Sequence, residues 1–238
     1  MTIRAPSLSS FLKITLRSGA VALAFPLLVL TTGVSRASED DTAITAQKFD
    51  PRVPLYKQLR PKWGVEASTS MNAFGGNAST PYGPTSKIWA VSIQLDYQPA
   101  WIQRFGVLSF GPSANVYPVL PPTDLTNGRF SIWSVGAQIR YQARYVREQI
   151  LVPTVGYDIQ SMSYGLNANK NGRTTIQGSF YGLMLLLNPL DPISAADFYG
   201  NYKIMRTYIV GEVRTLSSTD PVIAFSQPSA YFGLRLEY

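Results

Sequence analysis

The chain contains neither cysteine nor histidine in its 238 residues. Without cysteine it forms no disulfide and no thiolate metal site, and it has no N-terminal cysteine to carry a lipid. Histidine is the usual general base near neutral pH and the commonest metal ligand, so its absence removes the most frequent routes to catalysis and to metal binding. We therefore expect no catalytic residue, no metal and no cofactor.

Charged residues are also scarce, at 15% of the chain, and the net charge of +7 is concentrated at the N-terminus. Residues 1–37 hold four basic residues and no acidic one, which leaves 17 basic against 14 acidic residues in the remainder. That remainder contains no run of Lys or Arg of the kind that follows a phosphate backbone. Nucleic acid is therefore not an expected partner.

The N-terminal residues have the layout of an export signal. A basic leader precedes an apolar run over residues 20–30, after which the small residues Ser35 and Ala37 precede an acidic stretch over 38–41. This order predicts a signal peptide at 1–37 that is cleaved after Ala37. An uncleaved membrane anchor is disfavoured, because a spanning helix needs roughly 20 apolar residues.

Beyond the signal, the sequence suggests no helix that could span a membrane. The longest remaining apolar stretch, 183–187, is far too short. A closed β-barrel is the other structure that satisfies every backbone amide in hydrocarbon. Residues 38–62 contain three prolines and should form an irregular periplasmic segment, which would leave 63–238 for a transmembrane barrel.

Strict alternation of apolar and polar residues dominates the body of the chain, and it is clearest over 89–97. Successive side chains of a strand point to opposite faces, so this segment has one apolar and one polar face. The apolar face carries Trp89, Val91, Ile93, Leu95 and Tyr97, and the polar face carries Ala90, Ser92, Gln94 and Asp96.

The same period recurs often enough to predict about eight strands in a closed, antiparallel, up-and-down transmembrane β-barrel, an all-β fold. Pro112 should cause a bulge or a break in its strand, because it lacks an amide for the ladder. Apolar residues on both faces leave the phase of 183–187 open. The predicted strands are 63–74, 89–97, 105–118, 131–145, 149–161, 174–187, 203–215 and 230–238.

The connections between these strands are of two kinds. Polar stretches rich in turn residues, near 75–87, 119–130, 162–173 and 216–227, should form outer loops. Short inner turns are expected near 99–104 and 144–148. A longer inner connection, 188–202, has room for a helical turn.

A secreted soluble barrel that carries a ligand would show the same alternation, with the apolar face turned inward. The charges decide against it, because they are too sparse to cover a soluble exterior and suit an interior where opposite charges pair. Neighbouring strands should place Arg206 level with Glu237, and barrel closure should bring Glu66 near Arg235. The predicted interior network comprises Glu66, Gln94, Asp96, Gln138, Arg140, Asp158, Arg206, Glu212, Arg214, Arg235 and Glu237.

Aromatic residues on the apolar phase mark both ends of the predicted strands. Such girdles are expected where a barrel wall meets the two membrane–water interfaces. The predicted girdle comprises Trp63, Trp101, Tyr97 and Tyr145 at the inner interface, and Trp89 and Trp133 at the outer one.

The chain ends inside a strand, and Gly233, Leu236 and Tyr238 resemble the C-terminal insertion signal of outer-membrane proteins. This resemblance implies that the barrel-assembly machinery reads the last strand during insertion. The pattern as a whole resembles the small OmpX- and OmpW-type barrels of Gram-negative bacteria. It implies an integral protein of the outer membrane, in contact with lipid and lipopolysaccharide.

Two functions remain open at this point. The first is a structural or surface-contact role in the cell envelope, without catalysis. The second is a narrow channel for small molecules. A plugged interior favours the first, and a continuous polar cavity favours the second. Outer-membrane lipid A deacylases, palmitoyltransferases, phospholipases and omptin proteases use an essential histidine, so their activities do not carry over to this chain.

Overall fold

A computed structural model describes most of the chain beyond residue 51. The predicted signal peptide lies outside the described residues, as do the central parts of the outer loops predicted near 75–87, 119–130 and 162–173. The described residues are 52–73, 75–76, 87–103, 106–118, 130–146, 148–166, 170–218, 220–225 and 227–238.

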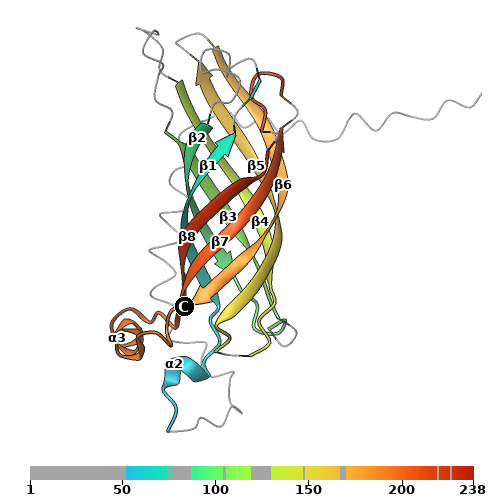
Figure 1. Cartoon of the computed structure of the whole chain (residues 1–238). Helices are drawn as coiled ribbons and strands as arrows, with labels where there is room; N and C mark the ends of the chain where they lie inside the picture. Colours follow the sequence, from blue (N-terminus) through green and yellow to red (C-terminus); the bar gives the residue numbers. More distant parts are fainter. Residues whose placement is uncertain are drawn as a thin grey trace, which may run out of the picture. The chain divides into compact units, whose positions relative to one another are not determined.

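Eight antiparallel strands close into one barrel in which each strand pairs with its neighbours in sequence and β8 pairs with β1 (Figure 1). The predicted fold class is therefore confirmed. The strands are β1 (Trp63–Ala73), β2 (Lys87–Tyr97), β3 (Val107–Tyr117), β4 (Phe130–Gln142), β5 (Leu151–Leu166), β6 (Lys170–Leu186), β7 (Arg206–Ser218) and β8 (Ser229–Glu237).

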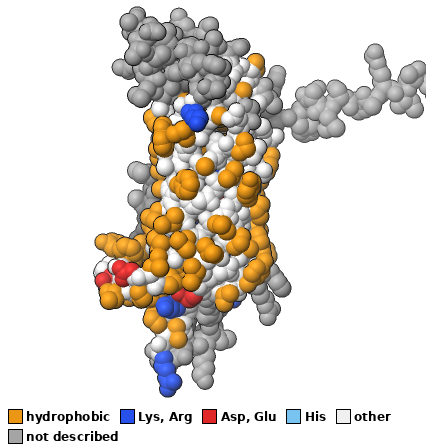
Figure 2. Space-filling model, viewed as in Figure 1, with side chains coloured by type: hydrophobic (Ala, Val, Ile, Leu, Met, Phe, Trp, Pro, Cys, Tyr) orange, Lys and Arg blue, Asp and Glu red, His pale blue; other side chains and the backbone are white. Residues whose placement is uncertain are grey.

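The side chains alternate between the two faces of the wall as the period of two predicts. On β2, Trp89 and Ile93 point outward and are 53% and 59% exposed, whereas Ala90, Ser92 and Asp96 point inward and are fully buried. Figure 2 shows hydrophobic side chains over much of the visible wall, with the charged ones toward its ends. The barrel therefore carries its apolar face outside and its polar face inside.

Pro112 interrupts the pairing of β3 with β2 without changing the register of the two strands. The pairs Gln94↔Ser113 and Tyr97↔Phe110 keep one register between β2 and β3 on both sides of the proline. On the other edge, β3 pairs continuously with β4, with Pro112 opposite Ala137. A bulge would have inserted a residue and changed the register. Of the two predicted outcomes, the local break is correct and the bulge is wrong.

The open phase of residues 183–187 is resolved by the structure. Leu183 points outward, whereas Met184 and Leu186 point into the barrel and are fully buried. There they pack in an apolar cluster with Val152 and Tyr208. Apolar residues occupy both faces because the inner end of the barrel has an apolar patch of its own.

Strands β5 and β6 run farther toward the outer end than predicted. They pair as far as Leu166 and Lys170, inside the segment expected to be a loop at 162–173. Outward residues there, such as Ser163 and Arg173, are polar, so both faces look polar in sequence and the strand signal is lost.

In the described part of the chain, two helices lie at the other end of the barrel. α2 (Leu55–Gln58) is a single turn within the segment expected to be irregular. The connection from β6 to β7 holds α3 (Pro192–Tyr202), a longer element than the helical turn anticipated there. Asp191 caps its N-terminus, Pro192 occupies its first turn, and Lys203 ends it in the left-handed conformation, at φ 60°. No helix in the described part of the chain is long and apolar enough to cross a membrane.

Candidate functional site: the ionic interior of the barrel

All eleven residues of the predicted interior network point into the barrel, and each is at most 3% exposed. They come from β1, β2, β4, β5, β7 and β8. With Arg144, the ionic side chains buried among the described residues number five arginines and five carboxylates. The interior is therefore densely charged but formally neutral.

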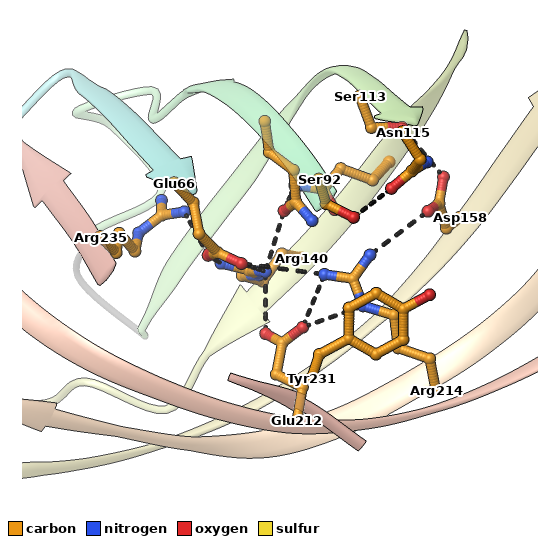
Figure 3. Close-up of polar contacts among 12 residues, drawn as sticks. Glu66, Ser92, Ser113, Asn115, Arg140, Asp158, Glu212, Arg214, Tyr231 and Arg235 are labelled. Carbon is orange, nitrogen blue, oxygen red and sulfur yellow. Dashed lines mark hydrogen bonds and ion pairs between the residues drawn. The ribbon is translucent and has the colours of Figure 1, made fainter. Parts of the chain in front are cut away.

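Arg140 on β4 lies at the centre of this network (Figure 3). Its guanidinium donates to the Glu66 carboxylate on β1 through both terminal nitrogens. Nη2 also lies 2.8 Å from Glu212 on β7 and donates to Gln94 on β2 at 3.1 Å. One cation thus links strands from opposite sides of the barrel.

Arg214 on β7 forms the next contacts along the interior. Its Nη2 lies 2.8 Å from Glu212, and its Nη1 lies 3.5 Å from Asp158 on β5. The guanidinium also stacks over the rings of Tyr231, at 4.4 Å, and Phe180, at 4.9 Å. Such cation–π contacts are strongest where water is excluded, so the rings help to hold a charge that water does not reach.

Arg235 on β8 joins the centre of the network to the inner end. Its Nη1 lies 2.6 Å from Asp96 and 3.4 Å from Glu66, and its Nε lies 3.3 Å from Glu237. The predicted approach of Glu66 and Arg235 across the closure is thereby confirmed, because the two residues are register partners on β1 and β8.

Glu237 gathers the cations at the inner end. Arg144 Nη1 lies 2.6 Å from its carboxylate, and Arg206 Nη1 lies 3.9 Å away. Gln98 donates to the same carboxylate at 2.9 Å. Arg206 is the register partner of Glu237, as predicted. The Arg206 Nε and Nη1 atoms have no hydrogen-bond partner among the described residues, which makes Arg206 less satisfied than Arg144.

Arg144 was not in the predicted network because it falls in the segment expected to be an inner turn, 144–148. The structure turns it into the barrel, where it also donates to the Tyr208 hydroxyl at 2.9 Å. Its position continues the alternation of Arg140 and Gln142, so the parity of the strand was a signal that could have identified it.

A layer of neutral polar groups adjoins the ionic groups on their outer side. Asn115 Nδ2 donates to Gln160 at 2.7 Å and to Ser134 at 3.0 Å, and Ser92 donates to Asn115. Gln138 Nε2 donates to Gln94 at 2.6 Å and to Asp96 at 2.8 Å, which ties this layer to the charges.

Apolar side chains then close the outer end of the interior. They come from the outer ends of six strands and from the β7–β8 connection, whose Ile223 and Phe225 fold inward. The alternation alone did not reveal this layer. Its members occupy inward-facing positions of the strands, where the pattern leads one to expect polar residues. The cluster comprises Ile88, Ala90, Tyr117, Ile132, Met162, Tyr164, Ile176, Leu216, Ile223 and Phe225.

The predicted girdle residues all lie on the outside. Trp63 and Tyr97 pack together with their ring centroids 5.0 Å apart, at the inner end of β1 and β2. Trp89 and Trp133 are exposed near the outer ends of their strands, and Trp101 is exposed in the β2–β3 turn. Tyr145 is exposed in the β4–β5 turn.

The predicted insertion signal occupies the end of β8. Gly233 and Leu236 are paired with both β1 and β7, and the Tyr238 amide donates to the Trp63 carbonyl at 2.8 Å. Recognition of this strand by an assembly machinery stays a prediction.

An open hollow of about 460 Å³ lies at the outer end of β5 and β6, and the sequence did not predict it. Arg173 Nε donates to Ser161 at 2.7 Å at its edge, and the Tyr164 hydroxyl donates to Asp220 at 2.9 Å. Its lining is polar and comprises Ser161, Arg173, Thr174, Thr175 and Asp220.

The interior network is built to hold charge in place. Each of the five carboxylates has at least one arginine within ion-pair distance, and Glu66, Glu212 and Glu237 have two or more. Groups that are this buried and this paired brace the strands from within, and no proton acceptor among them faces an open cavity. Within the described ranges, no set of three or more acidic side chains is placed to hold a metal ion.

Comparison with known proteins gives a likeness of fold. No protein-family model matches the chain, and no curated protein sequence matches it. The crystal structure of Neisserial surface protein A aligns with 74% of this chain and 97% of its own, at 12% identity and a TM-score of 0.50. That of Ail, the attachment invasion locus protein of Yersinia pestis, aligns with 76% of this chain and 99% of its own, at 10% identity and a TM-score of 0.37. Together with the closed eight-stranded topology, the likeness to the neisserial protein shows that this chain has the fold of the small outer-membrane β-barrels.

Proposed function

We propose that this chain is an integral, non-conducting β-barrel of the bacterial outer membrane. In this proposal it is exported by a signal peptide cleaved after Ala37, and it serves a structural role in the envelope and makes surface contacts through its outer end. The observation that carries the proposal is the sidedness of the wall. Ten paired charges lie inside, and apolar side chains lie outside.

The outward face matches a lipid environment. Ile93, Val155 and Leu183 are about half exposed on three different strands, which would be unfavourable in water over so large an area. The inner and outer aromatic residues bracket this band, as in barrels that span the outer membrane. Both ends of the barrel chain lie at the end with the short turns, which we assign to the periplasm.

The interior supports a closed barrel and not the alternative, a narrow channel. Arg140, Arg235 and Glu237 are fully buried, so no water-sized space touches them. An ion on this path would first have to pass the apolar cluster at the outer end, where Ile132 and Ile176 are fully buried as well. Hydrophobic constrictions block ions by excluding water. We therefore assign the ion pairs to structure and expect no catalysis.

The outer end supports a role in surface contact. Strands β5 and β6 extend beyond the length of about 9–11 residues that a spanning strand needs. The polar hollow around Arg173 lies on this extension and would face the cell exterior. Polar groups on these paired strands are suited to contact a partner in water.

Planar-bilayer recording of the purified barrel tests the closed state. We expect a flat baseline at applied voltages at which a general porin, incorporated as the positive control, gives clear steps. Uniform, steady conductance steps from this chain would overturn the non-conducting assignment and favour the channel. Membrane fractionation combined with heat-modifiable gel migration tests the location separately.

A further inference from the structure

The barrel end that bears α2 and α3 carries unusually exposed apolar side chains. Leu190 and Ile193 are 75% and 78% exposed, more than any described apolar side chain of the strands, and both belong to the β6–β7 connection. Trp101 in the β2–β3 turn and Tyr145 in the β4–β5 turn are also highly exposed. All three inner connections therefore present apolar or aromatic groups at one end of the barrel.

α3 has a narrow polar stripe and no single apolar face. Its polar side chains Ser194, Asp197 and Asn201 recur at i, i+3 and i+7, so they share one narrow stripe. Apolar residues flank the stripe, with Ile193 on one side and the packed pair Phe198 and Tyr202 on the other. The helix contains no basic residue. The helix therefore offers apolar side chains to a partner, and no positive charge that would attract anionic groups.

The connection that carries α3 is tied together at its base. Asn188 donates to the Met205 carbonyl and accepts from the Thr207 amide, both at 2.9 Å, which closes the connection at its base. On the helix itself, Ala195 is buried and Tyr199 lies 6.0 Å from the ring of Tyr56 on the α2 side. Protein therefore covers part of α3, and the exposed apolar side chains are those on its flanks.

We propose that α3 is an interfacial helix that rests in the headgroup region of the periplasmic phospholipid leaflet, with Leu190 and Ile193 inserted among the lipids. Continuity with the barrel wall identifies lipid as the occupant. In Figure 1 α3 projects sideways from the end of the barrel at which the C-terminus lies. Figure 2 shows the hydrophobic side chains of this region adjoining those of the wall. The β6–β7 connection leaves the wall at the barrel end that bears Trp63 and Tyr97, so a leaflet that surrounds this end would lie beside the connection.

The proposal rests on the proposed membrane location, so the experiment must separate the two. Because the chain has no cysteine, single cysteines placed at Ile193, Asn201 and Ile93 can each carry one environment-sensitive fluorophore. Each labelled barrel is reconstituted in phosphatidylethanolamine–phosphatidylglycerol vesicles at high dilution. Quenching is then measured with aqueous iodide and with lipids that bear a nitroxide near the headgroup or deep in the acyl chain.

We expect the Ile193→Cys label to be quenched at least threefold more by the shallow nitroxide lipid than the Asn201→Cys label, and to be protected from iodide. The Ile93→Cys label, in the middle of the wall, should be quenched by the deep nitroxide. If Ile93→Cys behaves so but the two α3 labels respond alike, the helix proposal is wrong and the barrel assignment stands. Protection of Ile193→Cys that depends on protein density and ignores the nitroxide would mean that a second copy covers the helix, which also overturns the proposal. Failure of Ile93→Cys would overturn the membrane location itself.

Discussion

Replacing Arg140 by methionine should strongly destabilise the barrel. Arg140 is fully buried and contacts two carboxylates, Glu66 and Glu212. Removing one partner of a buried ion pair costs about 3–5 kcal/mol, because the remaining charge is left without water and without its partner. Here Arg235 still lies 3.4 Å from Glu66 and Arg214 lies 2.8 Å from Glu212. These remaining contacts place the expected cost near the lower end, at about 3 kcal/mol.

A second substitution makes this prediction more specific. With Glu66→Gln added to Arg140→Met, the interior regains its charge balance, with four arginines and four carboxylates among the ten original groups. We expect the double variant to be more stable than the sum of the single changes predicts, by about 1–2 kcal/mol, which lies within the range of roughly 0.5–3 kcal/mol for residues in one network.

Urea unfolding in phospholipid vesicles, followed by tryptophan emission and by gel migration of the folded form, measures these free energies. Arg173→Met is the matched control, because Arg173 is an exposed arginine with a single hydrogen bond to Ser161, and its loss should change stability by less than about 0.5 kcal/mol. If Arg140→Met costs no more than this control, water screens the interior charges. The reasoning about a closed, dry interior would then be refuted.

Three further predictions follow from other parts of the barrel. Ile93→Arg, in the lipid-facing wall, should lower the free energy of unfolding by about 2–4 kcal/mol in the same urea assay. Thr175→Arg, at the outer end, should lower it by less than about 1 kcal/mol. Equal losses of stability would argue against a lipid-facing band. Gly111→Ala should destabilise the barrel by about 1–3 kcal/mol, because the new Cβ would collide with the Leu95 carbonyl beside the Pro112 break. Gly200→Ala on α3 has open space around the new Cβ, so it should be neutral or stabilising. The hydrogen bonds from the Ser194 side chain and amide hold the pKa of Asp191 below its usual range, so this cap stabilises α3 above the ordinary aspartate pKa and is lost as the pH falls through the lowered value. In hydrogen-exchange mass spectrometry at neutral pH, Asp191→Ala should therefore speed amide exchange within α3 and leave exchange in the strands unchanged. Equal protection of α3 in the two proteins would contradict the role of the cap.

Which residues face the interior was largely predictable from the sequence, because a period of two is a local property of each strand. Asp96 on β2 and Arg235 on β8 were assigned to the inward face from their immediate neighbours in the chain. Contacts between adjacent strands, such as Arg206 with Glu237, followed from the antiparallel order. Both kinds of inference depend only on short stretches of sequence and on the order of the strands.

Contacts across the barrel were not predictable in this way. Arg140 on β4 meets Glu212 on β7, and whether two such strands place side chains at one height depends on the tilt and stagger of the closed sheet. The outer apolar layer escaped prediction for the same reason, because Ile88, Ile132 and Ile176 are far apart in sequence and come together only when the barrel closes.

The full length of helix α3 and the extension of β5 and β6 were missed for a different reason. The residues of α3 include Gly200 and Pro192, and its apolar positions follow no clear stripe, so its pattern resembled that of a loop. In the hairpin, polar residues such as Ser163 and Arg173 face water on the outside, which removes the contrast between the two faces.

Spin-label scanning along β2 tests the sidedness of the wall most directly. A nitroxide is attached to single cysteines from Ile88 to Asp96 in the reconstituted barrel, and its collision rates with oxygen, which concentrates in lipid, and with a water-soluble nickel complex are compared. We expect accessibility to oscillate with a period of two residues. Oxygen accessibility should peak at positions 89, 91 and 93, and accessibility to both reagents should be low at positions 90, 92 and 94. High accessibility to the nickel complex at 92 and 94 would show a water-filled interior, and oxygen peaks at the even positions would show a wall that faces the opposite way. Either result would contradict the account.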